Sequence, residues 1–212
     1  MCSIGCDLAL ASYYIRNGAN ISYISNIMKS KVVSNPQDII TYNKNKDSVK
    51  FSNRVNVPFP CECLNGVFLG HTFMYKIQHG DVYASIAEST FRNLTTEDWL
   101  LRVNSYSPTN IPDDGTFNIT VNCSCGNREV STAYSLFITY PLRREDTLES
   151  IAKDTELDAE LLQKYNPGVD FSQGYGLVFI PGKDENGVYV PLPSRKPGVA
   201  FKLNQIISYT HI

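Results

Sequence analysis

Six cysteines are the residues with the clearest chemistry in this chain of 212 residues. They occur as one C-x-x-x-C pair near the start and two later C-x-C pairs, and none lies beyond residue 125. Cysteines in such pairs can bind zinc or form disulfides. Zinc sites usually combine C-x-x-C or C-x-x-x-x-C pairs with histidines at ligand spacing, and the histidines here are not so placed. The pattern therefore favours a disulfide framework, formed by Cys2, Cys6, Cys61, Cys63, Cys123 and Cys125.

The pairing of these cysteines stays open at this point. Two cysteines separated by one residue cannot easily bridge each other, so each C-x-C pair should reach outward to a distant segment. Many pairings still satisfy that condition. A set of N-x-S/T sequons agrees with an oxidising, secretory compartment. They begin at Asn20, Asn93, Asn118 and Asn122, which are the candidate glycosylation sites.

Carboxylates are not arranged for hydrolysis in this sequence. A glycosidase needs two carboxylates held across a cleft. Glu62, Asp81, Glu97 and Asp98 are scattered, and helix capping explains most of them. Common nucleophile, metalloprotease and phosphate-loop motifs do not occur. We predict that this chain is not an enzyme and needs no cofactor and no metal.

The composition indicates a folded protein without a polyanionic partner. Hydrophobic residues make up 42% of the chain and charged residues 19%, which excludes wholesale disorder. The formal net charge is −2, so no basic field attracts nucleic acid or an anionic membrane. No apolar stretch of about 18 residues occurs that could span a membrane. The start Met-Cys-Ser lacks the charged and apolar regions of a signal peptide, so we expect a mature fragment.

An internal repeat organises the elements that must position these residues. Residues 80–87 and 145–152 share Asp, Ser, Ile and Ala at four matching positions. Further along each copy, an apolar helical run ends in Asn104 or Asn166, and a short β-type run follows. A weaker copy near the N-terminus has Asn43 at the same point. Three copies of about 45–50 residues therefore cover most of the chain.

Each copy is predicted to fold in the order strand, helix, helix, strand. One such unit is a small core, so disulfides between the copies would add stability. The junctions between the copies carry the two C-x-C pairs, which suits cross-links that hold the copies in one rigid body. The predicted strands with defined ends are 54–58, 72–77, 117–121, 136–140 and 176–181.

Helix caps can be read from the same alignment of copies. Asp81 and Asp146 precede apolar residues at helical spacing, so we predict that they are N-caps, with Glu149 completing a capping box after Asp146. Tyr83 occupies an apolar helical position and is expected to lie in the core. The second helices are predicted to begin at Asn35-Pro36, Thr95-Thr96-Glu97 and Asp158.

The repeat resembles the LysM module, a strand–helix–helix–strand unit that opens on Gly-Asp-x-Tyr/Leu-x-x-Ile-Ala and is centred on Asn. Three such modules separated by two C-x-C motifs resemble the extracellular region of plant LysM receptor kinases, in the branch of the chitin elicitor and Nod-factor receptor kinases. The resemblance covers residues 2–195. Blocks typical of that branch are residues 8–14, 57–63, 68–71, 93–96, 122–126 and 139–142.

The resemblance implies an α+β fold of three βααβ LysM modules clamped into one compact body by disulfides. The expected modules are 1–63, 64–125 and 126–195, and a tail, 196–212, is expected to be disordered or loosely docked. In the family, a membrane helix and a Ser/Thr kinase follow this point, and the sequence here contains neither. The disulfides implied by the family are Cys2–Cys63, Cys6–Cys125 and Cys61–Cys123.

The resemblance also implies a ligand, an N-acetylglucosamine oligomer that is chitin-derived or lipid-modified. It lies in a shallow groove of the second module, where backbone groups can bind the sugar amide and Pro108 and Ile111 face the acetyl methyl. Family members that bind chitin can have acidic residues at the positions of Gly80 and Ala84, so mainly backbone contacts remain on that wall. One implied wall is Gln78, His79, Gly80, Asp81, Val82, Tyr83 and Ala84. The other is Ser105, Tyr106, Ser107, Pro108, Thr109, Asn110 and Ile111, with Glu97 nearby.

Three functions remain open on the sequence. The leading hypothesis is a receptor ectodomain at the extracellular face of the plasma membrane that binds chitooligosaccharide in plant immunity. The second changes the ligand to a lipochitooligosaccharide perceived in symbiosis. The third is a soluble co-receptor or decoy that acts through a protein partner. Because each sugar would bind weakly to a flat site, affinity should need several sugars or ligand-induced association with another LysM receptor.

Overall fold

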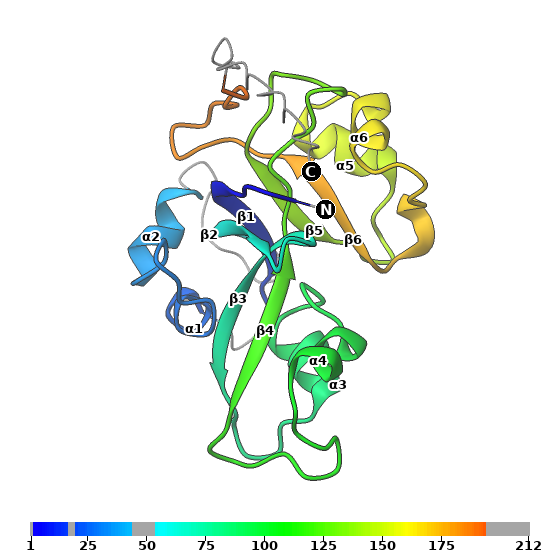
Figure 1. Ribbon diagram of the computed structural model, residues 1–212. Helices are drawn as coiled ribbons and strands as arrows, with labels where there is room; N and C mark the ends of the chain where they lie inside the picture. The colour runs from blue at the N-terminus through cyan, green and yellow to red at the C-terminus, as the bar shows by residue number, and fades with distance from the viewer. Residues whose placement is uncertain (1, 17–19, 44–53, 194–212) are drawn as a thin grey trace, which may run out of the picture.

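The computed structural model describes residues 2–16, 20–43 and 54–193, and the predicted tail 196–212 lies outside the described residues. Three βααβ units follow one another along the chain (Figure 1). The first module contains β1 (Cys6–Tyr14), α1 (Ile21–Ile27), α2 (Pro36–Thr41) and β2 (Arg54–Leu64). The second contains β3 (Phe68–Lys76), α3 (Tyr83–Ser85) with a π-helical turn η1 (Ile86–Thr90), α4 (Glu97–Val103) and β4 (Thr116–Asn122). The third contains β5 (Phe137–Pro141), α5 (Leu148–Thr155), α6 (Ala159–Tyr165), a short 3-10 turn η2 (Phe171–Gln173) and β6 (Leu177–Pro181).

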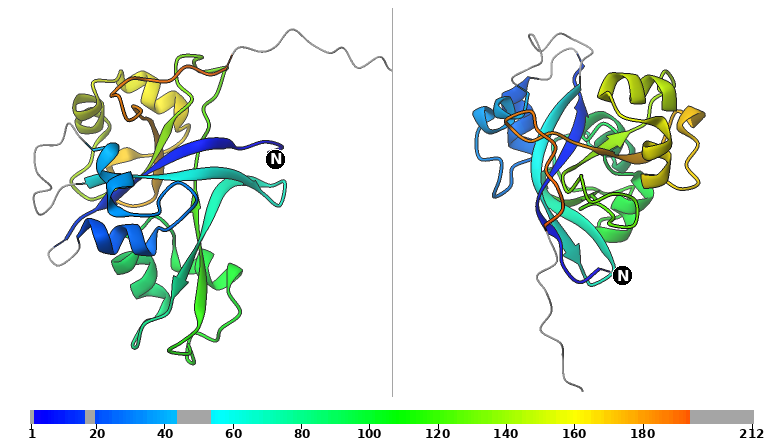
Figure 2. Two further views of the ribbon diagram at one scale, coloured as in Figure 1. Left: turned by 90° about the vertical axis from the view of Figure 1, so that its left-hand side faces the viewer. Right: turned by 90° about the horizontal axis from the view of Figure 1, so that it is seen from above.

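The strands of all three modules join in one sheet with the order β4-β3-β2-β1-β5-β6. Each module contributes one antiparallel pair. The second module joins the first through an antiparallel β2–β3 contact, and the third joins it through a short parallel β1–β5 contact. Figures 1 and 2 show α1 and α2 on one side of the strands and α5 and α6 on the other. The predicted α+β fold class with three modules is confirmed.

Strand β2 is longer than predicted. It runs to Leu64 rather than ending at Pro58, and β3 begins at Phe68 rather than at Thr72. These extra residues pair with each other, Glu62 opposite Gly70 and Leu64 opposite Phe68. A pairing between modules is a tertiary contact, which the local pattern of either module does not contain.

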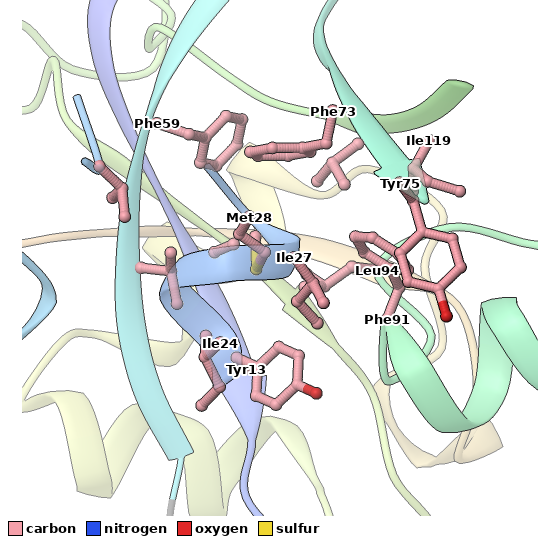
Figure 3. Close-up of a cluster of buried hydrophobic side chains, with 14 of the residues drawn as sticks. Tyr13, Ile24, Ile27, Met28, Phe59, Phe73, Tyr75, Phe91, Leu94 and Ile119 are labelled. Carbon is pink, nitrogen blue, oxygen red and sulfur yellow. The ribbon is translucent and has the colours of Figure 1, made fainter. Parts of the chain in front are cut away.

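The first two modules share one hydrophobic core. Figure 3 shows Ile27, the last residue of α1, and Met28 beside aromatic residues of the second module. Phe73 and Phe91, one on β3 and the other just after η1, are buried in this cluster. The third module has a separate cluster built from Leu142, Ile151, Ala152, Leu162, Phe171, Val178 and Ile180. The first and second modules are therefore bound together by apolar packing as well as by strand pairing.

The N-caps of the first helices differ from the prediction. Val82 caps α3 and Thr147 caps α5, and the side-chain oxygens of Ser85 and Ser150 accept their backbone N–H groups at 3.0 and 2.9 Å. Asp81 and Asp146 lie one residue earlier, and Glu149 takes no part in the capping box. The predicted caps of the second helices are confirmed at Asn35, Thr96 and Asp158.

Asp81 and Asp146 instead fix the turn between the first strand and the first helix. The carboxylate of Asp81 accepts the hydroxyl of Tyr75 at 2.8 Å and the N–H of Gln78 at 2.7 Å. Asp146 makes the equivalent bonds with Tyr140 at 3.0 Å and the N–H of Arg143 at 2.8 Å. Each aspartate is committed to donors from the preceding turn, which is why the cap shifts to the next residue.

Three disulfides lie where the modules meet. They join Cys2 to Cys63, Cys6 to Cys125 and Cys61 to Cys123, which are the pairs that the family resemblance implied. The last two bridges are neighbours, with Sγ of Cys125 3.5 Å from Sγ of Cys61. Together they tie β1 and β2 to the segment that follows β4. The first two modules therefore cannot separate unless these disulfides are broken.

Candidate functional site

The first predicted wall lies between β3 and α3 in the second module. Gln78 to Asp81 form a tight turn in which the N–H of Asp81 donates to the carbonyl oxygen of Gln78 at 3.0 Å. Gly80 is the third residue of this turn and has a φ of 83°, a value that glycine adopts without strain. An acidic residue at Gly80 would be strained in this turn, which gives a physical reason for the missing side chain. Gln78, His79, Gly80 and Val82 are exposed, and Asp81 and Ala84 are half-buried.

The second predicted wall lies between α4 and β4. Its centre is a turn in which the N–H of Asn110 donates to the carbonyl oxygen of Ser107 at 2.9 Å, with Pro108 and Thr109 between them. The hydroxyls of Ser107 and Thr109 are 3.0 Å apart. Ser105, Ser107, Pro108, Thr109 and Asn110 are exposed, while Tyr106 and Ile111 pack partly against the core. The polar residues of this turn are therefore exposed, while Tyr106 and Ile111 hold the turn against the core.

Two contacts hold the walls together. The hydroxyl of Tyr83, on the first wall, donates to the carbonyl oxygen of Tyr106, on the second, at 2.8 Å. Tyr83 is buried with 1% of its surface exposed, as predicted, and its ring packs against Phe117, which also contacts the ring of Tyr106. Near the tip, Nδ1 of His79 lies 3.0 Å from Oδ2 of Asp113. The structure thus brings together two loops that are distant in the sequence.

The two walls carry few charged groups. The hydrogen bond and charge of Asp113 raise the pKa of His79, whose side chain is 92% exposed. Burial raises the pKa of Tyr83, so its hydroxyl stays a neutral donor. A surface of amide, hydroxyl and carbonyl groups with few charges suits an uncharged ligand that carries hydroxyls and amides.

Glu97 is the predicted residue that the structure does not tie to either wall. It lies exposed in the first turn of α4, and within the described part of the chain its carboxylate makes no hydrogen bond or ion pair. Asp113 and Gly115 are residues that the sequence argument missed. A Cβ at Gly115 would lie 2.9 Å from the hydroxyl of Tyr106 and 2.8 Å from Ile77, so this position leaves no room for a side chain. The glycine at position 115 could have indicated close packing in the sequence. Nothing in the sequence indicated the contact of Asp113 with His79.

The sulfurs of three cysteines form the one close group of potential metal ligands among the described residues. Across the described ranges, one group of three or more potential ligands lies close together, the sulfurs of Cys6, Cys61 and Cys125. All three are bonded in disulfides and cannot act as thiolate ligands.

The four sequons differ in accessibility. Asn20 caps α1 and Asn118 lies on β4, and both are exposed. Asn93 is also exposed and has a φ of 63°. Asn122 is half-buried beside Cys123, and its carbonyl oxygen accepts the hydroxyl of Thr139 at 2.6 Å.

Comparisons with known proteins match this chain to LysM domains. The family described as LysM domain matches residues 138–181, and the one described as LYK3/4/5 LysM2 domain matches residues 68–121, which include both walls. A crystal structure of the LYK3 ectodomain superposes with a TM-score of 0.88 at 48% identity, covering 92% of this chain and 99% of that one. The chain belongs to the LysM receptor kinase family. It is a LysM ectodomain, as the sequence resemblance predicted.

Curated relatives of this LysM ectodomain are receptor kinases. Chitin elicitor receptor kinase 1 of Arabidopsis thaliana is 46% identical over 202 residues, and LysM domain receptor-like kinase 3 of Medicago truncatula is 49% identical over 200 residues. Each match covers 92% of this chain but only 33% and 32% of the respective relative. The chain therefore spans about a third of the length of these relatives and corresponds to their ectodomain. Of the helices in the parts that the structure describes, none has the length and apolar character needed to cross a bilayer.

Proposed function

We propose that this LysM ectodomain binds N-acetylglucosamine oligomers at the paired loops of the second module. The observation that carries the proposal is the hydrogen bond from Tyr83 to Tyr106, which joins two walls whose residues are mostly exposed and polar. The sugar is uncharged and carries an amide, hydroxyls and an acetyl methyl, and the loops supply backbone groups, small hydroxyls and the half-buried Ile111. The name of the Arabidopsis relative supports this ligand class.

The surface character of the loops sets the expected affinity. Most residues of the two walls are exposed, so the proposed site lies at the surface of the second module. A shallow polar site gains little free energy from each sugar, because water competes for the same hydrogen bonds. We expect affinity to rise with the number of sugars and to be enhanced when one oligomer bridges two ectodomains.

Calorimetric titration with chitin oligomers of increasing length tests the proposal. A bulky replacement in the second wall, Thr109→Trp, should abolish the heat seen with long oligomers by filling the groove. Thr132→Trp is the matched control, because Thr132 is also exposed but lies in the segment before β5. Absence of heat with every oligomer at high protein concentration would overturn the proposal, as would equal binding by the two variants.

A lipochitooligosaccharide is the second candidate ligand. The observation that favours it is the side chain of Val82, which is 49% exposed on the first wall and could lie against an acyl chain. If the acyl chain is read there, Val82→Asp should weaken binding of the lipid-modified oligomer and leave binding of the unmodified oligomer unchanged. Equal effects on both ligands would remove this candidate.

The remaining expectations concern the setting of the ectodomain. We propose that it acts on the extracellular face of the plasma membrane, without catalysis of its own, and associates with another LysM receptor when ligand is bound; a soluble co-receptor or decoy is the alternative. Light scattering with and without a long chitin oligomer distinguishes a bridged pair from a monomer.

We further propose the module limits 1–63, 64–125 and 126–195. We also propose glycosylation at the exposed sequons Asn20, Asn93 and Asn118, with glycosylation of Asn122 hindered by its burial.

A further inference from the structure

A second concave surface lies between the first and third modules. It is a cleft of about 640 Å³, within the range of small-molecule sites. Its floor is formed by the sheet, through Ser12 on β1, Asn56 on β2 and Ile138 on β5. The C-terminal ends of α2 and α5 form two sides, and the segment that follows β6 runs back toward the first module and forms another (orange in Figure 1).

The positive charges in the floor of the cleft are already paired. The guanidinium of Arg54 lies 3.2 Å from the carboxylate of Asp146 and 3.8 Å from the ring centre of Tyr140. Arg143 contacts Glu145 and lies 3.7 Å from the ring centre of Tyr14. These side chains join the first module to the third, and their charge is neutralised locally.

Negative charge is in excess around the rim. Among the described residues that line the cleft, six carry carboxylates and three carry cationic side chains, a difference of three negative charges. Asp154, Asp184 and Glu185 form no ion pair with any residue in the described ranges, and Glu156 has only a long 3.7 Å contact with Lys183. Burial and the charges of Glu185 and Asp184 raise the pKa of Tyr42 on the opposite side. The rim therefore attracts a cation.

The distances between these carboxylates indicate which kind of cation the cleft can bind. Among the described residues, no three carboxylates gather closely enough to ligate one metal ion. An extended ligand with several separated ammonium groups suits such a rim better than a metal ion does. The rings of Tyr42 and Tyr189 also line the cleft and provide flat surfaces of the kind found in sugar sites.

We propose that the cleft between the first and third modules binds a short glucosamine oligomer whose free amino groups are protonated. This ligand is the deacetylated counterpart of the oligomer assigned to the second module. The inference rests on that proposed function only for the choice of a sugar as the ligand. The ammonium groups pair with the rim carboxylates, and the sugar faces lie against the tyrosine rings. Acetylation removes the positive charge, so the two surfaces discriminate between the two forms of the sugar.

Calorimetry with the glucosamine trimer and the N-acetylglucosamine trimer tests this assignment, in mildly acidic buffer where amines and carboxylates are charged. The variant is Asp154→Asn with Glu185→Gln, which leaves the turn-forming carboxylate of Asp184 intact. It should weaken binding of the glucosamine trimer by about five-fold, since exposed ion pairs contribute little each. The control, Asp7→Asn with Glu129→Gln, removes the same charges at exposed positions outside the cleft and should stay within about two-fold.

Failure of this inference is distinguishable from failure of the proposed function. Thr109→Trp should leave binding of the glucosamine trimer unchanged while abolishing binding of long chitin oligomers. The cleft variant should weaken binding of the glucosamine trimer by about five-fold and leave binding of long chitin oligomers unchanged. Trilysine carries similar charge without sugar, so its equally tight binding would overturn the assignment to an amino sugar. The absence of glucosamine binding, or equal losses in the cleft variant and its control, would overturn it as well.

Discussion

The side chain of Asn166 joins the end of α6 to Phe179 on β6 through both of its polar atoms. Its Nδ2 donates to the carbonyl oxygen of Phe179 at 2.9 Å, and its Oδ1 accepts the N–H of Phe179 at 2.7 Å. Nδ2 also donates to the carbonyl oxygen of Leu162 at 2.9 Å, which closes the helix end. The same three bonds recur in the other modules, from Asn43 to Ile39 and Asn56 and from Asn104 to Leu100 and Asn118.

This arrangement predicts that Asn166→Ala strongly destabilises the third module. Asn166 has 4% of its surface exposed, and its loss leaves the N–H and carbonyl groups of Phe179 without these partners. We expect the free energy of unfolding to fall by about 2–3 kcal/mol, measured by denaturant titration with module-resolved hydrogen exchange. Asn26→Ala is the control, because Asn26 is an exposed residue of α1, and it should change stability by less than about 0.5 kcal/mol. Equal losses in the two variants would contradict the structural role.

Tyr83→Phe should loosen the two loops of the second module without disrupting the core. The ring of Tyr83 can still pack against Phe117, but the hydrogen bond to the carbonyl oxygen of Tyr106 is lost. We expect a stability loss of about 1 kcal/mol, faster amide exchange in residues 105–111 and weaker binding of long chitin oligomers. Tyr175→Phe, at an exposed position in the third module, is the matched control. Unchanged exchange in the loop would show that the bond does not hold it.

The contact between His79 and Asp113 predicts a pH-dependent link between the first wall and the segment that follows the second wall. Since the folded-state pKa of His79 is raised, the pair is fully formed below the ordinary pKa of histidine and is lost as the pH rises through the raised value. Affinity for long chitin oligomers should therefore decline as the pH rises through that window. An NMR titration of the His79 ring measures the shift, and Asp113→Asn should return the pKa toward its ordinary value. Asp98→Asn, on α4, should leave the His79 titration unaltered; a shift of similar size there would point to net charge rather than to the contact.

The repeated asparagines show how much of the fold the sequence contained. Residues 43, 104 and 166 were recognised as the ends of helical runs, and each bonds to the closing strand of its module. The second-helix caps were equally local and were predicted correctly. The caps placed at Asp81 and Asp146 were wrong because an aspartate before a helix can bond backward as well as forward, and only the tertiary position of Tyr75 or Tyr140 decides which.

Contacts between modules could not be predicted in this way. The parallel pairing of Leu10 with Ile138 and the ion pair of Arg54 with Asp146 join residues that share no local pattern. The walls of the candidate site were placed by resemblance, but the bond of Tyr83 to Tyr106 and the contact of His79 with Asp113 required coordinates. The acidic cleft could not be recognised from the sequence, because its carboxylates come from α5, from the residues on either side of α5, and from the segment after β6.

Arg54 is predicted to hold the third module against the first. Its guanidinium donates to the carbonyl oxygen of Pro141 at 2.7 Å and pairs with Asp146 at 3.2 Å, with 13% and 12% of the two side chains exposed. Arg54→Met keeps a side chain of similar length but leaves the carboxylate of Asp146 without its cation. We therefore expect the free energy of unfolding to fall by about 3 kcal/mol. Hydrogen exchange should accelerate in β5 and α5 more than in β3 and β4. Lys164→Met removes an exposed cation paired with Glu160 and should have little effect. Uniform acceleration across the sheet would instead indicate that the three modules unfold as one unit and that Arg54 stabilises the whole body.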